Sequence, residues 1–164
     1  MSCDPQELTS ALQTIPWFQE LSPEHFNLLC GISDLRKVES GEELFKEGDK
    51  QDYLYIVLEG RIAVDIFVPG RGRMRIFTAE PMDVVGWSSA IPVVRQRTAS
   101  ARTVLPGRLI CIDAPKLRQL SEENHDLGYV VMRRLANVIA GRLLITRLQL
   151  LDMFAHPAQE VGRD

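Results

Sequence analysis

Residues 35–113 constrain the fold of this chain most strongly. They form short β-rich runs separated by Gly, Pro and Asp at intervals of roughly ten residues. This punctuation is typical of a β-barrel or a β-sandwich. Between residues 61 and 67, large apolar side chains (Ile62, Val64, Ile66) alternate with Arg61, Ala63 and Asp65, which predicts a strand covered on one face only. We expect strands over residues 35–39, 43–46, 53–58, 61–67, 73–79, 97–104 and 107–113.

Helical spacing of apolar residues precedes the β region. Residues 5–15 and 22–33 repeat Leu, Ile and Phe three or four positions apart, which predicts two short N-terminal helices. Ser22 followed by Pro23 is a typical helix start, with an N-cap and a proline at the first helical position. We therefore expect the chain to enter its β region from a small helical segment.

After the β region, Pro115 begins a short helix, and residues 121–124 are the expected cap of a much longer one over residues 123–154. A helix of that length spans about 45 Å at about 1.5 Å per residue, more than a domain of this size can cover. One apolar stripe consists of Leu127, Val131, Leu135, Val138 and Ile145, and a second of Met132, Ala136, Ile139, Leu143 and Leu150. One stripe can pack on the β region, and the other predicts a partner helix and a homodimer. The alternative is that both stripes face one broad groove in the same chain.

The bulk properties fit one ordinary domain. The chain has 164 residues, of which 45% are hydrophobic and 25% are charged. We divide it into an N-terminal helical segment (1–34), a β core (35–113), a helical region (114–154) and a flexible tail (155–164). No apolar run reaches the roughly 20 residues that span a bilayer, and the N-terminus lacks a basic segment leading into an apolar one. We therefore expect a cytoplasmic protein.

The charge and the metal-ligating residues exclude several classes of protein. A net charge of −3 argues against a surface that neutralises nucleic-acid phosphates, so we expect no direct DNA binding. The cysteines and histidines are scattered, and none lies in a C-x-x-C, H-x-H or H-E-x-x-H arrangement: Cys3, Cys30, Cys111, His25, His125 and His156. We expect reduced structural thiols and no metal site.

Two blocks resemble the sensor domain of the catabolite activator and Fnr family of bacterial regulators. Residues 39–49 (ESGEELFKEGD) are similar to the family's first turn, and residues 52–62 (DYLYIVLEGRI) are close to its consensus. The likeness runs from about residue 17 to residue 152. It implies a mainly β fold with flanking helices, namely a β-roll or jelly roll (double-stranded β-helix) with short N-terminal helices and a long C-terminal helix.

The resemblance also bears on partners. The family's full-length regulators continue past the long helix into a helix-turn-helix DNA reader, whereas this sequence ends at Asp164. We therefore expect a stand-alone sensor or interaction module, acting through a separate effector protein.

A third block resembles the phosphate cassette of cyclic nucleotide-binding domains. The candidate ligand-binding residues are Gly86, Trp87, Ser88, Ser89, Ala90, Arg97 and Thr98. A glycine turn followed by small residues can present backbone N–H groups to an anion. The guanidinium of Arg97 suits bidentate pairing with a phosphate, and Thr98 offers a further donor. The alternative is that Arg97 pairs with a carboxylate and that Gly86 merely turns the chain.

Trp87 is the main departure from the family's pattern, which has a glutamate here that accepts hydrogen bonds from the ribose 2′-hydroxyl. An indole N–H only donates, and losing such a charge-assisted bond costs about 1.5–3 kcal/mol. Where relatives that recognise cyclic AMP place Thr or Ser against adenine, this chain has Val138 and Ile139. Trp87 either stacks on a base or another flat ligand, or fills the vacated pocket. Arg95 would add a second charge and favour a more highly charged anion.

Two hypotheses of function follow. The first is a non-enzymatic regulatory module that binds a cyclic nucleotide or another phosphorylated small molecule with altered specificity, and in which the long helix moves against the barrel. The second is a ligand-independent dimeric interaction or scaffold module whose pocket Trp87 fills. Enzymes on related barrels need clustered metal ligands, and residues 35–113 contain no histidine, so we expect no enzymatic activity.

Overall fold

The computed structural model describes residues 5–50, 52–94 and 96–155. The predicted tail from residue 156 onward, and Arg95, lie outside the described residues. The chain enters through α1 (Pro5–Gln13), a 3-10 helix η1 (Pro16–Glu20) and α2 (Pro23–Cys30). The Ser22 hydroxyl caps α2 by accepting a hydrogen bond from the His25 N–H at 3.2 Å, as the sequence predicts. The spacing of apolar residues did not predict the 3-10 helix η1, which begins at Pro16.

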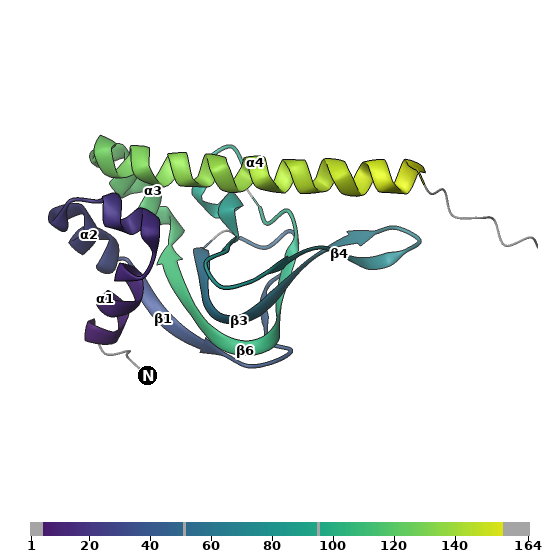
Figure 1. The fold of residues 1–164 in the computed structure, drawn as a ribbon, viewed down its shortest axis with the longest axis horizontal. Coiled ribbons are helices and arrows are strands. Elements are labelled where there is room, and N and C mark those ends of the chain that lie inside the picture. Colours follow the sequence, from purple (N-terminus) through teal and green to yellow (C-terminus); the bar gives the residue numbers. More distant parts are fainter. Residues whose placement is uncertain (1–4, 51, 95, 156–164) are drawn as a thin grey trace, which may run out of the picture.

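The sheet consists of β1 (Ser33–Val38), β2 (Glu43–Phe45), β3 (Tyr53–Val68), β4 (Gly72–Ala79), β5 (Val84–Val85) and β6 (Ser100–Asp113). Its strands are antiparallel, in the order β1-β6-β3-β4, with β2 added to β6 and β5 to β3. β3 and β6 are long and strongly curved, and they wrap the sheet into a roll (Figure 1). The expected mainly β fold with flanking helices is confirmed.

Two pairs of predicted strands are each one continuous strand. Residues 53–58 and 61–67 both belong to β3, while 107–113 and the part of 97–104 from Ser100 onward belong to β6. Gly60 has a φ of 88° and lies against the β6 backbone, where an added Cβ would come within 2.6 Å of the Leu105 carbonyl oxygen. The register also shifts on both sides of Glu59. This glycine therefore marks a bulge that bends the strand, whereas the prediction treated it as a turn.

The helical region differs from the prediction at its junction. α3 (Ala114–Glu123) includes Ser121, and Asn124 ends it, so residues 121–123 form the last turn of α3. α4 (His125–Ala155) begins directly afterwards, two residues later than predicted. The Asp113 carboxylate caps α3 by accepting a hydrogen bond from the Lys116 N–H at 2.9 Å. None of the described helices is long and apolar enough to cross a membrane.

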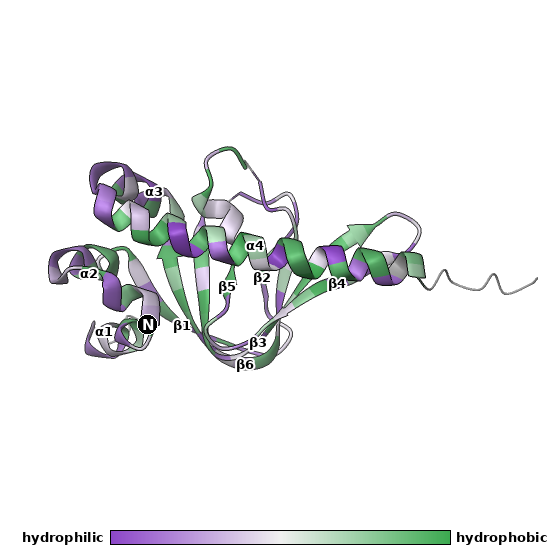
Figure 2. Cartoon of the chain, turned by 45° about the horizontal axis from the view of Figure 1, so that its top comes forward, coloured by the Kyte–Doolittle hydropathy of each residue, from purple (hydrophilic) through white to green (hydrophobic). Residues whose placement is uncertain are grey.

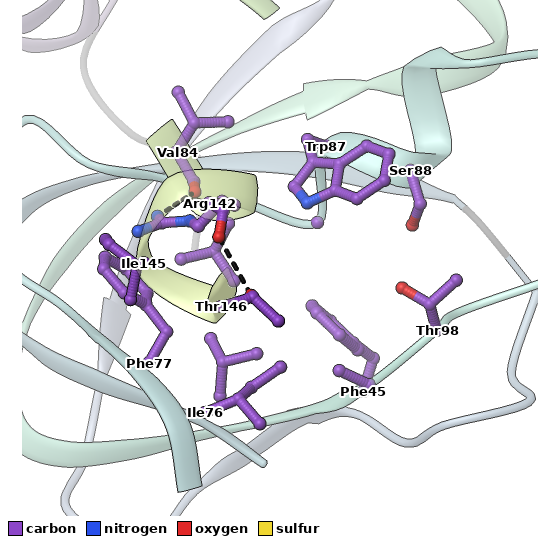
Figure 3. A pocket seen from close by; sticks show the side chains of 14 residues that line it. Phe45, Ile76, Phe77, Val84, Trp87, Ser88, Thr98, Arg142, Ile145 and Thr146 are labelled. Carbon is purple, nitrogen blue, oxygen red and sulfur yellow. Dashed lines mark hydrogen bonds between the residues drawn. The ribbon is translucent and has the colours of Figure 1, made fainter. Parts of the chain in front are cut away.

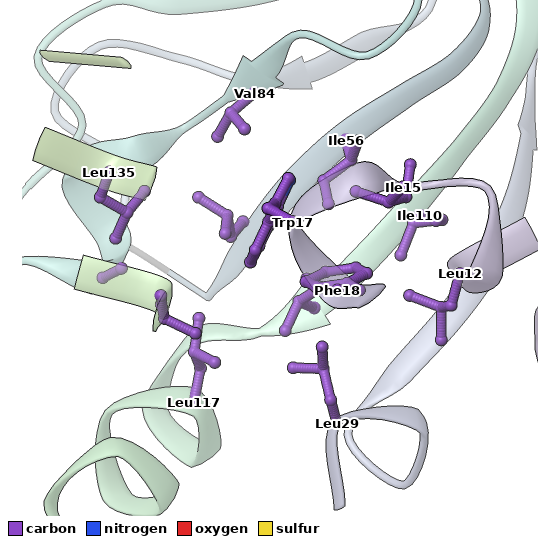
Figure 4. Close-up of a cluster of buried hydrophobic side chains, with 14 of the residues drawn as sticks. Leu12, Ile15, Trp17, Phe18, Leu29, Ile56, Val84, Ile110, Leu117 and Leu135 are labelled. Atoms are coloured by element: carbon purple, nitrogen blue, oxygen red, sulfur yellow. The ribbon is translucent and has the colours of Figure 1, made fainter. Parts of the chain in front are cut away.

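One core cluster joins the N-terminal helices, the sheet, α3 and the start of α4 (Figure 4). Its buried members include Leu12, Ile15, Trp17, Phe18, Leu29, Ile56, Val84, Ile110, Leu117, Leu127, Val131 and Leu135. A second cluster fills the roll, with Phe45, Tyr55, Ile62 and Leu109 among its members. The beginning of the first predicted α4 stripe is therefore buried on the domain.

α4 runs across the open side of the roll and continues beyond it, over β4 (Figure 1). Its C-terminal half carries several hydrophobic residues (Figure 2) that are exposed: Leu143, Leu144, Leu148, Leu150, Leu151 and Phe154. The helix thus has two parts. Its N-terminal part is packed on the core, and its C-terminal part turns one face to the roll and leaves the other exposed.

Candidate functional site

The predicted cassette begins at a left-handed turn. Gly86 has a φ of 76°, and the 3-10 helix η2 (Trp87–Ala90) follows it directly. The Ser89 hydroxyl bridges the turn, lying 2.7 Å from the Gly86 carbonyl oxygen and 3.1 Å from that of Tyr53. The Ser89 and Ala90 side chains are completely buried. The turn is therefore fixed against the start of β3.

Arg97 is a second fixed point of the same turn. Its guanidinium donates hydrogen bonds to the Tyr53 carbonyl oxygen at 2.6 Å and to the Gly86 carbonyl oxygen at 3.2 Å. The guanidinium carbon lies 4.0 Å from the centre of the Phe45 ring, and the residue is only 3% exposed. Its partners are thus main-chain carbonyls, where the alternative drawn from the sequence had expected a carboxylate.

Burial has an electrostatic consequence for Arg97. It lowers the pKa of the guanidinium below its ordinary value, although the attraction of Asp52 and Asp49 opposes the shift. The Arg97 backbone also joins the loop before β3, because its N–H donates to the Asp49 carbonyl at 3.0 Å. Arg97 therefore holds three chain segments together.

A cavity of about 180 Å³ lies between this turn, the roll and α4. Figure 3 shows its walls, with Ser88 and Thr98 at one end and Arg142 beside Phe77 at the other. The lining is mostly apolar: Phe45, Val64, Ile76, Phe77, Val84, Val85, Gly86, Trp87, Ser88, Thr98, Ala99, Arg142, Ile145 and Thr146. On the same measure, one water needs only about 10–15 Å³. The cavity can therefore hold a small organic group.

Trp87 forms one wall of this cavity. Its side chain is partly buried, packs against the main core cluster and turns its ring nitrogen toward the interior (Figure 3). The cavity volume remains open beside the indole. Trp87 thus occupies part of the space beside the turn, and a cavity remains next to it.

Arg142 is the lining residue that the sequence reasoning missed. Its Nη2 lies 3.3 Å from the Val84 carbonyl oxygen, and its guanidinium carbon lies 2.9 Å from the centre of the Phe77 ring. Burial lowers its pKa, against the attraction of Asp83. A signal was present: Arg142 follows Val138 by four positions and precedes Ile145 by three, so it lies on the first of the two predicted apolar stripes.

The structure divides the predicted site residues into two groups. Gly86, Trp87, Ser88 and Thr98 line the cavity. Ser89, Ala90 and Arg97 are buried behind this wall and support the turn. Val138 packs against the core cluster. The described part of the chain contains no group of side chains that could hold a metal ion.

Comparison with known proteins relates this chain to cyclic nucleotide-binding proteins, by sequence and by structure. The family model described as "Cyclic nucleotide-binding domain" matches residues 35–124. A CRP-like cAMP-activated global transcriptional regulator of Mycobacterium tuberculosis is 30% identical over 114 residues, which is 69% of this chain and 48% of that protein. Two curated relatives are longer proteins, of which this chain spans 31% and 48%.

Solved structures share the fold. A cyclic nucleotide-binding domain from Methylobacillus flagellatus aligns with a TM-score of 0.73 and 25% identity, over 96% of this chain and 86% of that one. The Catabolite Activator Protein of Thermus thermophilus aligns with a TM-score of 0.65 and 23% identity, over 84% of this chain and 63% of that one.

Proposed function

The chain belongs to the cyclic nucleotide-binding domain family, and from that premise we propose that it is a regulatory module that senses a phosphate-bearing small molecule and reports it through α4. The observation that carries the proposal is the shared cavity. Ser88 and Thr98 from the cassette and Arg142 and Thr146 from α4 line the same space. A ligand there contacts both parts at once and so biases the position of α4.

The ligand specificity is altered relative to a cyclic nucleotide sensor of the usual kind. Trp87 stands where the resemblance implies a glutamate for the ribose, and an indole cannot accept that hydrogen bond. The indole instead offers a flat surface that stacks on a base or another planar group. We therefore propose a ligand with a planar or apolar body and a phosphate or similar group.

The output of the module is an arrangement of α4, and a second copy of this chain is the proposed partner. Leu144, Leu148 and Leu151 are spaced four and three positions apart and are 60%, 67% and 64% exposed. Such spacing produces a helix-pairing seam. A ligand that shifts α4 would change the geometry of the pair, which a separate effector protein could read.

The experiment is a titration that uses Trp87 as its own reporter. The chain has two tryptophans, so Trp17→Phe leaves Trp87 as the only indole. We expect a saturable fluorescence change with at least one of cyclic AMP, cyclic GMP, cyclic dinucleotides and linear nucleotides. Thr146→Phe, which places a ring in the cavity, should remove the change, while Arg147→Phe at the neighbouring position outside the cavity lining should keep it.

A second candidate function is a ligand-independent dimeric scaffold. Arg97 favours it, because this buried guanidinium already bonds two carbonyls and lies over Phe45. The titration separates the two functions. If none of the compounds changes Trp87 fluorescence or the melting temperature, the scaffold stands and the sensor proposal fails.

A further inference from the structure

We propose that Arg142 of α4, and not Arg97, supplies the positive charge that holds the ligand, and that the ligand carries one anionic group on a flat apolar body. This inference rests on the proposed function, since it specifies the ligand of the same cavity. The positively charged group that binds the ligand is then on α4 and not in the cassette.

The first step of the argument is access. Arg97 is 3% exposed and lies behind the cavity wall, with two of its N–H groups directed to the carbonyls of Gly86 and Tyr53. The cavity lining does not include Arg97, so an anion in the cavity does not contact its guanidinium. Arg142, in contrast, is half-buried and lines the cavity itself.

The second step is the unused binding capacity of Arg142. A guanidinium has five N–H donors. Within the described residues, Arg142 has one long hydrogen bond, at 3.3 Å to the Val84 carbonyl oxygen, and no salt bridge. Burial disfavours its charge, which an anion placed beside it would stabilise. The half-buried cation therefore prefers an anionic occupant.

The third step concerns the rest of the cavity. Phe45 and Ile76 form an apolar side, and Trp87 faces them across the space with its indole (Figure 3). A flat apolar body fits between them, with its anionic group toward Arg142 and its polar edge toward Ser88 and Thr98. A nucleotide phosphate and an aromatic carboxylate share this chemistry, whereas a neutral analogue lacks the charge that Arg142 needs.

The first experiment needs no knowledge of the ligand. In the Trp17→Phe background, iodide, caesium and acrylamide are compared as quenchers of Trp87. We expect iodide to quench more strongly than caesium, and Arg142→Met to remove this excess while acrylamide quenching stays the same. Arg147→Met removes one charge from the same helix outside the cavity and should leave the excess intact. Equal iodide quenching in the two variants would overturn the proposal.

The second experiment uses two matched pairs: cyclic AMP with adenosine, and 2-naphthoate with 2-naphthamide. Calorimetry should detect binding of the anionic member of at least one pair, and the pairs distinguish a nucleotide from an aromatic acid as its source. Arg142→Met should weaken that binding about 10- to 100-fold. Binding with unchanged affinity in Arg142→Met contradicts the assignment. If neither pair binds while the iodide preference depends on Arg142, the anion site stands and the proposed sensing of these ligands fails.

Discussion

At the scale of single residues, Arg97 and Gly86 form one structural unit. The sequence pattern places them in one cassette, and the structure brings them into contact. The direction of the guanidinium was not predictable from spacing, because it depends on which main-chain carbonyls the fold brings within its reach. Here the fold uses a cation to satisfy two main-chain oxygens, and each such charge-assisted bond contributes about 1.5–3 kcal/mol.

Two glycines with similar backbone angles should respond differently to alanine. Gly41 has a φ of 84° with nothing near its added Cβ, so Gly41→Ala should cost about 1–2 kcal/mol from backbone strain alone. At Gly86, with a φ of 76°, the Cβ would also meet the Arg97 Nη1 and lie 3.2 Å from the Tyr53 carbonyl oxygen. Gly86→Ala should therefore cost at least about 1.5 kcal/mol more. Urea unfolding of both variants measures the difference, and equal costs would mean that Arg97 is not a support of the turn.

Cys111 predicts an alkaline loss of stability. Burial raises the pKa of its thiol to about 12, whereas an unfolded thiol titrates near about 8.5. Between these values the unfolded chain binds fewer protons, so the free energy of unfolding falls as pH rises, by about 1.4 kcal/mol per unit. Below about pH 8.5 this contribution is fully present. Urea unfolding at pH 8.5 and 10.5 should show the fall, and Cys111→Ala should reduce its slope; an unchanged slope would assign the effect to other groups.

At the scale of elements, the periodicity identified most helices and strands but misjudged their continuity. Gly60 lies in the gap between two predicted strands and Gly107 at the start of a third, yet both lie inside long strands where the backbones of β3 and β6 are in close contact. A glycine that allows a bulge and a glycine that allows a turn give the same local signal. β5 has two residues and was too short for any periodicity. The long helix was predicted because its apolar spacing extends over many turns. Its faces were predicted less well: Met132 of the second stripe packs on the core cluster, and the exposed Leu144, Leu148 and Leu151 belong to neither predicted stripe.

The exposed seam of α4 should control the oligomeric state. Leu148 is 67% exposed, so Leu148→Glu should change the stability of the single chain by about 0.5 kcal/mol or less. A charge at the centre of a helix-pairing seam should nevertheless abolish the dimer. Analytical ultracentrifugation is expected to give twice the chain mass of 18.5 kDa for the wild type and that mass itself for Leu148→Glu.

The matched control is Leu105→Glu, an exposed leucine on β6 away from α4. It should stay dimeric. If Leu148→Glu has the same mass as the wild type, the seam is not the interface.

At the scale of the whole molecule, the resemblance predicted the fold and the cassette residues that form one wall of the cavity, but not its other walls. The family and the mainly β fold were predictable from the blocks at residues 39–49 and 52–62. The cavity was not, because its walls come from β2, β3, β4, β5, the turn and α4. No local pattern reports how far apart such elements come to rest. Arg142 is the clearest case. That it lines a cavity could not be predicted from α4 alone, because the opposite wall comes from other elements.

The central position of β6 also sets the order in which the chain can fold during its synthesis. β1, β2 and β3 all pair with β6, as in the pairs Ser33 with Ile112, Phe45 with Ala101 and Tyr53 with Asp113. While the ribosome is still making the first half of the chain, only the β3–β4 hairpin has both of its strands. The pairings with β6 can form only after residues 100–113 have been made, and pairings so distant in sequence form slowly. Because α4 follows β6 in the sequence, the cavity is complete only after Arg142, Ile145 and Thr146 have been made.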